Sequence, residues 1–484
     1  MAAKPVYSAS SAGKYPITYG REVYPAAELR FPVGREPGQA RCFRELSGEG
    51  LFVNTLVSGG KGRGKTAGLV KRFLAHICGH PQRPGALVYD VKGDLAPYII
   101  QWARAVGRED DVRVIDPDGL FKLRLFPAGM PAETIANIFV TAISTIAGGT
   151  DPREAFWVQS AEELIKFYIQ LLRAAAVDMA RPVSPLEILN LLGQDDDVQQ
   201  VVNRILIKSE CGEYTTAKQK HIVRYLDKFH HRHSQLDHRV RTSIEAEINR
   251  FMHDFSGYEM SRVFSPGLDD KCVSVDEIIN DGALVVLRMP QCRYGEVSRF
   301  IGMLIKSQFY NAVMRRLTDA TLNQQRPVFF VADEFQNFAT IGGKVGADDQ
   351  FAALSRQARA GMFCAIQELG SLYSVGGQNA TEAVSNLIQN FQNHIMLRQD
   401  LTPRLRELLS GKGLTEISCL PKLKPFEALF FRDAENDARL IELGPYFGDW
   451  DYCRHENERQ GRELAARRDD ALKGLSGRGA GGGL

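Results

Sequence analysis

Short apolar runs alternate with helical spacings over two stretches of the chain. The first run, LFVNTLVSG, ends in a glycine-rich turn, and apolar residues then recur at helical spacing over 66–78. Helical spacing also covers 95–106 and 297–317. Further short apolar runs predict strands at 86–89, 112–115, 283–287, 328–332, 362–367 and 395–397. Strand–helix–strand order of this kind predicts an α/β fold with parallel strands joined by crossover helices.

Between these two stretches, residues 133–255 contain helical spacing and no apolar run that indicates a strand. The expected helices lie at 133–147, 155–176, 185–192, 197–208, 216–231 and 238–255. This pattern predicts an all-α domain inserted into the α/β domain. The predicted division is an N-terminal arm (1–45), an α/β domain in two parts (46–132 and 256–453), the inserted all-α domain (133–255), and a charged helix with a flexible glycine-rich tail (454–484).

The composition is that of an ordinary globular protein, with 44% hydrophobic and 24% charged residues among 484. The 60 basic and 58 acidic residues give a net charge of +2, so any DNA contact must come from a local patch or a ring of subunits. The cysteines are scattered without CxxC spacing, which argues against a zinc site and favours reduced thiols. We find no apolar run of about 18 residues and no signal peptide, so we expect a cytoplasmic protein.

The strongest motif is GGKGRGKT, which matches GxxxxGK[ST] and lies between an expected strand and an expected helix. Such a P-loop turns backbone N–H groups inward around phosphates, and the following helix adds a favourable potential for anions. Lys65 is expected to reach the β- and γ-phosphates, and Thr66 to coordinate magnesium. The alternative, a chance glycine-rich turn, is disfavoured by the flanking strand and helix. The candidate nucleotide-binding residues are Gly59, Gly60, Lys61, Gly62, Arg63, Gly64, Lys65 and Thr66.

The second motif is PVFFVADE, in which an apolar run ends in two carboxylates. Asp333 is expected to hold the magnesium shell with Thr66, and Glu334 to orient or deprotonate the attacking water. The alternative is a strand that leads into an acidic helix cap. Together the two motifs predict an ATPase that uses ATP and Mg²⁺, with Lys65 and Glu334 as catalytic residues.

Weaker candidates follow or precede other expected strands. The segment DVKGD (90–94) lies where ligands bind in parallel sheets, although a helix N-cap by Asp94 is the alternative. Gln367 ends an expected strand, where its side chain would face the γ-phosphate. Three arginines are candidates to supply positive charge to a neighbouring subunit's site, with a solvated side chain as the alternative for each: Arg356, Arg359 and Arg398.

Histidines and basic residues gather within the helical block. The histidines are His230, His231, His233 and His238, and the basic residues are Arg224, Lys228, Arg232, Arg239 and Arg241. No cysteine or carboxylate completes a recognised metal spacing, so a solvated helix end is the better interpretation of the histidines. The basic residues predict a surface for DNA or a partner, and the alternative is a solvated helical face.

An ordered series of segments resembles the coupling proteins of type IV secretion and conjugation. After the P-loop come YDVKGD, RVIDPDG and FWVQSAEELIKFYIQLL, and later VADEFQNF, SRQARAGMFCAIQELGSLYSVGG and RQDLTPRLRELLSGKGL. YDVKGD stands where the family has an Asp-Pro-Lys-Gly-Glu segment, and FWVQSAEELIKFYIQLL resembles the helix that opens the family's all-α domain. The resemblance covers about residues 50–430.

This resemblance implies a RecA-like P-loop nucleotide-binding domain with an inserted all-α domain, assembled as a hexamer around a DNA channel. It also implies that Gln367 is a sensor glutamine and that Arg359 is the candidate arginine finger. The chain departs from the family in having no pair of N-terminal membrane helices, and it has Val91 and Asp94 where the family often has proline and glutamate. Two alternatives follow from this departure: the chain belongs to a soluble branch of the family, or a partner protein supplies the link to the inner membrane.

The function that we expect is an ATP-driven DNA motor or coupling factor, with DNA and a relaxase or secreted effector as partners. The alternative is a nucleotide-controlled scaffold that recruits a relaxase or effector without moving DNA. Glu334, Gln367 and Arg359 together favour turnover over passive switching. A small-molecule kinase is disfavoured because no second substrate-binding motif is present.

Overall fold

The computed structural model describes residues 29–38, 43–80, 82–146, 155–342, 347–376, 381–411, 417–432 and 437–443. The predicted charged helix and glycine-rich tail at 454–484, and residues 1–28 of the predicted arm, lie outside the described residues.

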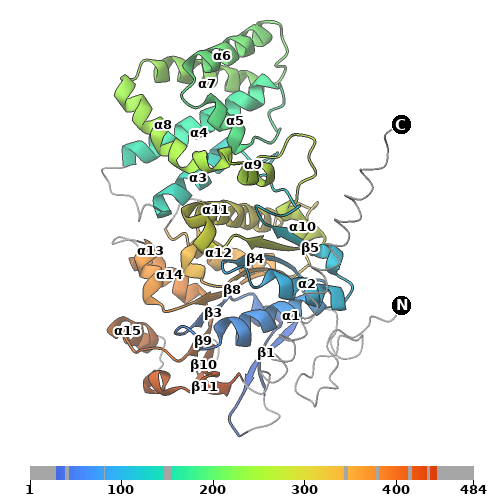
Figure 1. Cartoon of the computed structure of the whole chain (residues 1–484), viewed down its shortest axis with the longest axis vertical. Helices are drawn as coiled ribbons and strands as arrows, with labels where there is room; N and C mark the ends of the chain where they lie inside the picture. Colours follow the sequence, from blue (N-terminus) through green and yellow to red (C-terminus); the bar gives the residue numbers. More distant parts are fainter. Residues whose placement is uncertain are drawn as a thin grey trace, which may run out of the picture.

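One mixed sheet organises the part of the chain that the structure describes (Figure 1). Its strands are β1 Arg30–Arg35, β2 Phe43–Ser47, β3 Thr55–Ser58, β4 Gly85–Asp90, β5 Val112–Ile115, β6 Leu284–Arg288, β7 Val328–Ala332, β8 Ala360–Ile366, β9 Asn393–Leu397, β10 Glu427–Arg432 and β11 Asp437–Glu442. They lie in the order β2-β1-β11-β10-β9-β3-β8-β7-β4-β6-β5. The strands from β9 to β5 pair in parallel, and β10, β11, β1 and β2 extend the sheet in antiparallel pairs. The predicted parallel sheet is confirmed.

Helices cover both faces of the parallel strands because successive strand residues point to opposite faces. The helices α1 Lys71–Gly79 and α2 Ala96–Ala105 pack on one face, and α11 Gln291–Arg315 packs on the other. Two neighbours in β7 illustrate the alternation. Phe329 lies edge-to-face on Phe73 of α1 at 5.2 Å between ring centroids, whereas Phe330 lies against Tyr310 of α11 at 5.7 Å. The buried strands are apolar on both faces, as parallel strands between two helix layers require.

The chain between β5 and β6 forms the helical insertion, which stands above α11 in Figure 1. It contains α3 Ala132–Ile146, α4 Ala155–Ala175, α5 Pro185–Leu191, α6 Asp195–Glu210, α7 Ala217–Ser234, α8 His238–Met252, α9 Tyr258–Phe264 and α10 Val275–Asn280. Helix α4 is central and packs against α3, α5, α6, α7 and α8. Its Phe167 is stacked on Phe229 of α7 at 4.7 Å. The described residues of this stretch contain no strand, and α3 to α8 agree with the helices predicted from the sequence. Helices α9 and α10 lie beyond the predicted insertion and were not predicted, and α10 packs on the sheet against β4 and β6.

Four strands were absent from the sequence-based prediction, and two of them fall largely within the predicted arm. Strand β1 pairs with β2 on one side and β11 on the other, and Phe31 and Val33 are fully buried. The ring of Phe31 meets Phe73 of α1 at 5.3 Å. The prediction of a loose arm is therefore wrong from Arg30 onward, because these residues complete the sheet and its core. The hairpin of β10 and β11 was also missed.

The last part of the chain places four shorter helices around the sheet. These are α12 Asp348–Leu354, α13 Gly370–Gly376, α14 Thr381–Asn390 and α15 Pro403–Gly411. A fully buried ion pair ties α12 to α11, with Lys306 Nζ at 2.7 Å from Asp348 Oδ2. Asp348 also accepts a hydrogen bond from the Tyr310 hydroxyl at 2.7 Å. This network fixes the layer of helices that follows β7.

Candidate nucleotide site

The P-loop follows β3 at the carboxyl edge of the sheet, with β8 and β9 as the neighbours of β3. Gly62 and Gly64 have positive φ angles of 71° and 97°, which favour glycine. A Cβ on Gly59 would lie 2.7 Å from the Cβ of Leu397, so the turn also needs glycine for its close approach to β9. The helix begins directly after the loop, with a wide π-type turn at Thr66–Val70 that leads into α1. The predicted strand–loop–helix context is present.

Lys65 and Thr66 both turn into the site. The Lys65 ammonium donates to the carbonyls of Gly59 and Gly60, the latter at 3.1 Å. Burial lowers the pKa of Lys65 below its ordinary value, and the nearby charges of Glu334 and Asp333 oppose that shift. Thr66 Oγ1 donates to Asp333 Oδ2 at 2.7 Å. The hydroxyl and the carboxylate predicted to share a magnesium ion are therefore neighbours.

Asp333 and Glu334 follow β7, whose five residues are all buried. Their side chains are only 3% and 11% exposed. Glu334 has φ 56° and ψ 46°, a left-handed conformation that is uncommon for a non-glycine residue and that concentrates at functional sites. Its Oε2 accepts from Gln336 at 2.7 Å and from Gln367 at 2.9 Å. Gln367 reaches it because β8, which it follows, pairs with β7.

Lys92 is the residue whose role the sequence did not indicate. Its ammonium lies 2.9 Å from Asp333 Oδ2 and 3.1 Å from Glu334 Oε1, so one cation contacts both carboxylates. Burial alone would raise the pKa of Glu334, but hydrogen bonds from Gln336, Gln367 and Lys92 outweigh it and hold the pKa below its ordinary value. The arrangement keeps Glu334 ionised and oriented.

The 90–94 segment caps a helix and also positions Lys92. The carboxylate of Asp90 accepts from the backbone N–H groups of Asp94, Leu95 and Ala96, and so caps the start of α2. The helix cap considered for this segment is therefore present, but it is provided by Asp90 and not by Asp94. The turn that this cap holds carries Lys92 toward β7, because β4 and β7 are paired neighbours.

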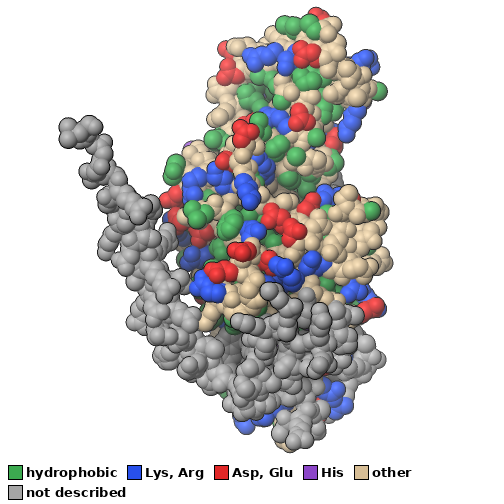
Figure 2. All heavy atoms as spheres, turned by 90° about the vertical axis from the view of Figure 1, so that its right-hand side faces the viewer, with side chains coloured by type: hydrophobic (Ala, Val, Ile, Leu, Met, Phe, Trp, Pro, Cys, Tyr) green, Lys and Arg blue, Asp and Glu red, His purple; other side chains and the backbone are tan. Residues whose placement is uncertain are grey.

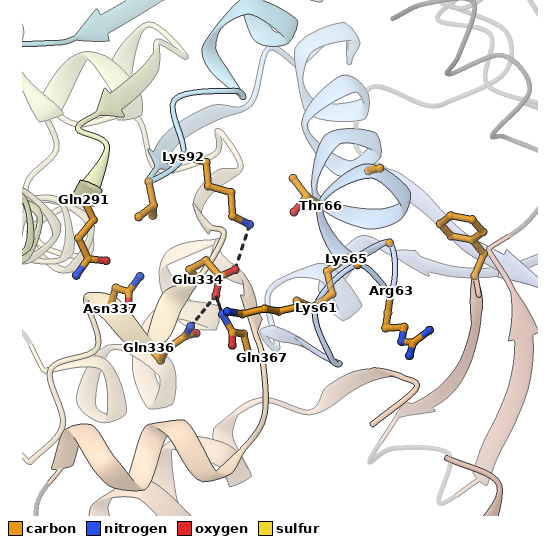
Figure 3. Close-up of a pocket in the computed structure, with 15 residues that line it drawn as sticks. Lys61, Arg63, Lys65, Thr66, Lys92, Gln291, Glu334, Gln336, Asn337 and Gln367 are labelled. Carbon is orange, nitrogen blue, oxygen red and sulfur yellow. Dashed lines mark hydrogen bonds and ion pairs between the residues drawn. The ribbon is translucent and has the colours of Figure 1, made fainter. Parts of the chain in front are cut away.

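These groups face one cavity of about 870 Å³ (Figure 3). The P-loop lines one wall, and residues that follow β4, β7 and β8 line the other. The close-up shows Lys92, Glu334, Gln336 and Gln367 gathered at one end, with Arg63 away from them on the far side of the P-loop. The cavity combines a phosphate-binding loop, a candidate Mg²⁺ shell and an ionised carboxylate, which together suit phosphoryl transfer to water.

Arg359 is not part of this cavity. It directly precedes β8, so it lies at the opposite edge of the sheet from Gln367. The seven residues of β8 span roughly 23 Å at about 3.3 Å each. The Arg359 guanidinium donates to the carbonyl of Gln325 at 3.0 Å and lies over the ring of Phe52. Arg359 therefore cannot act on the nucleotide site of its own chain.

The two other candidate arginines lie outside this cavity as well. Arg356 pairs with Glu49. Arg398 follows β9 and is exposed, and its carbonyl accepts from the N–H of Gly60 at 3.0 Å. That bond fixes the P-loop through backbone atoms and gives the Arg398 side chain no role in the cavity.

In the helical insertion, Arg173 is buried and donates to backbone carbonyls, whereas many other charged groups point to solvent or pair with one another. His230 contacts Gln199 at 2.7 Å, Arg232 pairs with Glu163 at 3.0 Å, and no group of metal-binding side chains forms among the described residues. On the face in Figure 2, basic and acidic side chains are interspersed over this part of the molecule. His231 and His238 are exposed, in agreement with a solvated helix end. His230 and His233 are instead partly buried and stack on Phe167 and Phe229, so the interpretation is wrong for these two.

The chain matches the family model for type IV secretory system conjugative DNA transfer over residues 32–397. It belongs to that family. The matched range runs from β1 to the end of β9 and includes the P-loop, the helical insertion and both carboxylates after β7. The family indicated by the ordered motifs is thereby confirmed. None of the curated protein sequences matches the chain at a significant level.

Several solved structures share the fold of this chain. The bacterial coupling protein TrwB in an unbound form superposes with a TM-score of 0.56 at 13% identity, over 81% of this chain and 85% of TrwB. A TrwB complex with ADP and Mg²⁺ gives 0.56 at 12% identity over the same shares. VirB4 of Thermoanaerobacter pseudethanolicus gives 0.52 at 13%, over 86% of this chain and 97% of VirB4. The RecA-like P-loop fold with its helical insertion is confirmed.

The described residues include no helix that is long and apolar enough to span a bilayer.

Proposed function

We propose that this chain is a Mg²⁺-dependent ATPase that moves or delivers DNA as a conjugative coupling factor. The observation that carries the proposal is the 2.7 Å hydrogen bond from Thr66 Oγ1 to Asp333 Oδ2, which joins the P-loop to the carboxylates after β7. Mg²⁺ prefers hard oxygen ligands of this kind and usually binds through one or two protein groups together with the phosphates. When bound, the ion would neutralise charge on the β- and γ-phosphates.

The P-loop residues from Gly59 to Thr66 would hold the triphosphate of ATP. Backbone N–H groups in the turn made by Gly62 and Gly64 suit phosphate oxygens, and the following helix N-terminus adds to that potential. Lys65 would contact the β- and γ-phosphates, where its buried ammonium gains a strong charge-assisted partner.

Glu334 would act as the general base. Its carboxylate takes a proton from water, the water oxygen bonds to the γ-phosphorus, and the bond from that phosphorus to the bridging oxygen breaks to release ADP and phosphate. Gln367, Gln336 and Lys92 would position this carboxylate through their contacts with it. Because Gln367 directly follows β8 and contacts Glu334, it would couple the presence of a γ-phosphate to the position of that strand.

Arg359 would complete the site of a neighbouring subunit in a ring, which we propose to be hexameric. Its place at the amino edge of β8 excludes action in its own chain, so a trans arrangement is the one in which it can neutralise charge on the transferred phosphoryl group. TrwB is described as a bacterial conjugative coupling protein and the matching family as type IV secretory system conjugative DNA transfer, so DNA and a relaxase or secreted effector are the proposed partners. A partner would recruit the chain from the cytoplasm to the inner membrane.

The test is an ATPase assay with and without single- and double-stranded DNA, run alongside particle mass measurement. We expect DNA to raise turnover and to shift the mass toward a ring. ATP binding without turnover under any of these conditions would instead favour a nucleotide-controlled scaffold.

A further inference from the structure

An aromatic ring lies directly over the P-loop. Phe426 precedes β10 and lines the nucleotide cavity, and its side chain is partly exposed there. A Cβ added to Gly64 would lie 2.5 Å from the Cδ1 and Cε1 atoms of Phe426. The ring is therefore in contact with the loop residue that precedes Lys65.

The backbone holds this ring in an unusual conformation. Phe426 has a φ of +66°, which is rare for a bulky side chain. Its carbonyl accepts a 2.7 Å hydrogen bond from the N–H of Leu443, and the next residue, Glu427, donates to the carbonyl of Lys424 at 3.1 Å. These bonds hold the backbone on either side of the ring, where β10 begins and β11 ends. The ring lies over the P-loop because β10 pairs with β9, which pairs with the P-loop strand β3. Unfavourable backbone conformations that are over-determined in this way cluster at functional sites.

The two ends of the cavity differ in chemistry. One end carries Glu334, Gln367 and Lys92, which suit the γ-phosphate and the attacking water. The ring of Phe426 lies on the P-loop instead, and Arg63 points away from the carboxylates (Figure 3). A triphosphate held with its γ-phosphate toward Glu334 would direct whatever is attached to its α-phosphate away from those carboxylates. That group is the nucleoside.

We propose that the ring of Phe426 is the platform on which the base of the bound nucleotide stacks. This inference rests on the proposed ATPase function and adds a residue that selects the nucleoside. A ring face attracts any base by stacking and reads no donor or acceptor pattern. Phe426 therefore favours nucleoside triphosphates over inorganic triphosphate and does not distinguish adenine from guanine.

The test measures binding by calorimetry in the presence of Mg²⁺, with ATP, GTP and inorganic tripolyphosphate as ligands. In Phe426→Ala, the dissociation constants for ATP and GTP should both rise about tenfold or more, because stacking on an aromatic ring contributes this much per base. Tripolyphosphate should bind as it does to wild type, which also shows that the P-loop remains folded. Phe426→Trp should retain nucleotide affinity, and Phe426→Leu should lose it because leucine has bulk without a ring face.

The control is Phe156→Ala, an exposed phenylalanine of the helical insertion, which should change none of the three affinities. Equal weakening of ATP and tripolyphosphate in Phe426→Ala would show that the ring only supports the P-loop, and would overturn the proposal. Unchanged ATP affinity in Phe426→Ala would overturn it as well. A wild-type protein that binds neither ATP nor tripolyphosphate would refute the ATPase proposal itself, and the stacking platform with it.

Discussion

The sheet domain and the helical insertion handle charge in opposite ways. At the carboxyl edge of the sheet, Asp333 and Glu334 are almost fully buried and receive several donors. In the insertion, Arg232 is 68% exposed and pairs with a carboxylate that is itself half exposed. Buried charges need fixed partners, whereas solvated pairs contribute little to stability. The two candidate catalytic carboxylates are therefore held in fixed positions by the sheet domain, whereas solvated pairs such as that of Arg232 leave the surface of the insertion adaptable.

One helix touches both regions. Helix α11 packs against α3 of the insertion and against β4 of the sheet, and its first residue, Gln291, lines the nucleotide cavity. Gly295 interrupts it with a φ of 52°, so the turn next to the cavity is set off from the long remainder. Any influence of the insertion on ATP turnover has a direct physical route through this helix.

The largest effect is expected from Lys65→Ala. This change removes the ammonium from the β- and γ-phosphates, so turnover should fall to background while the helical insertion remains folded. A steady-state ATPase assay with circular dichroism as the folding check measures both. Wild-type-like turnover in the folded variant would show that the sheet edge is not the nucleotide site.

Next comes Arg359→Ala, which should lower turnover by about 10³–10⁵-fold without much loss of ATP affinity, as for other arginine fingers. The loss corresponds to roughly 4–7 kcal/mol of barrier at about 1.36 kcal/mol per decade. Turnover of wild type should rise with protein concentration or DNA, and this rise should be absent from the variant.

Mixing the two variants tests the trans arrangement. Some interfaces between Lys65→Ala and Arg359→Ala subunits pair an intact P-loop with an intact arginine, so activity should partly return. If mixed assemblies form and no activity returns, the trans role of Arg359 is wrong.

Glu334→Gln should retain ATP and Mg²⁺ binding, since Asp333 and Thr66 are unchanged. Turnover should fall by about 10²–10⁴-fold because an amide cannot accept the proton from water. ATP-bound assemblies should accumulate, and mass measurement in ATP would detect them. Unaffected hydrolysis would identify Glu334 as a structural cap.

Lys92→Met should shift the pH dependence of turnover. Lys92 helps to hold the pKa of Glu334 below its ordinary value, so its removal raises that pKa. Because the ionised carboxylate is the active form, turnover on the acid side should then be lost at a higher pH than in wild type. Lys92→Arg keeps the charge and should leave the acid limb near its wild-type position. If the pH–rate profiles of Lys92→Met and wild type superimpose, Lys92 does not position Glu334.

The smallest effect on turnover is expected from the insertion. Arg224 and Lys228 lie one helical turn apart on α7 and are exposed. Reversing both to glutamate should weaken DNA or partner binding and reduce the salt dependence of DNA binding by about two units, with basal turnover nearly intact. Fluorescence anisotropy at several salt concentrations measures this. Arg204→Glu on α6 is the control, and an equal loss of basal turnover would make the insertion part of the motor core.

The sequence predicted the parts of the fold in which local pattern and burial agree. Strands such as β4 and β7 are continuous apolar runs because helices cover both faces, and the α3–α8 helices have clear helical spacing. Strands β1, β2 and β11 lack such runs, and the short apolar run of β10 was not recognised. Strand β1 joins the sheet by pairing with β11, and β10 by pairing with β9, and a local pattern does not contain such distant partners.

The same reason explains what was found and missed at the site. The P-loop and the two carboxylates are contiguous motifs whose chemistry fixes their residue types. Lys92 reaches Glu334 only through the pairing of β4 with β7, and Phe426 reaches Gly64 only because β10 pairs with β9, which in turn pairs with β3. The register of β8 places Arg359 beyond the reach of its own P-loop. A role as arginine finger is therefore restricted to the site of a neighbouring subunit.

The order of strands in the sheet also dictates when a nascent chain can acquire its activity. The P-loop strand β3 has as its neighbours β8 and β9, which the ribosome makes some 300 residues later, and Arg35 of β1 pairs with Glu442 of β11 across 407 positions. Long-range parallel pairing of this kind is slow and leaves unpaired edges exposed in the meantime. A growing polypeptide therefore carries a complete P-loop sequence without its neighbouring strands until β8 and β9 have been made, and nucleotide can be captured only after that point.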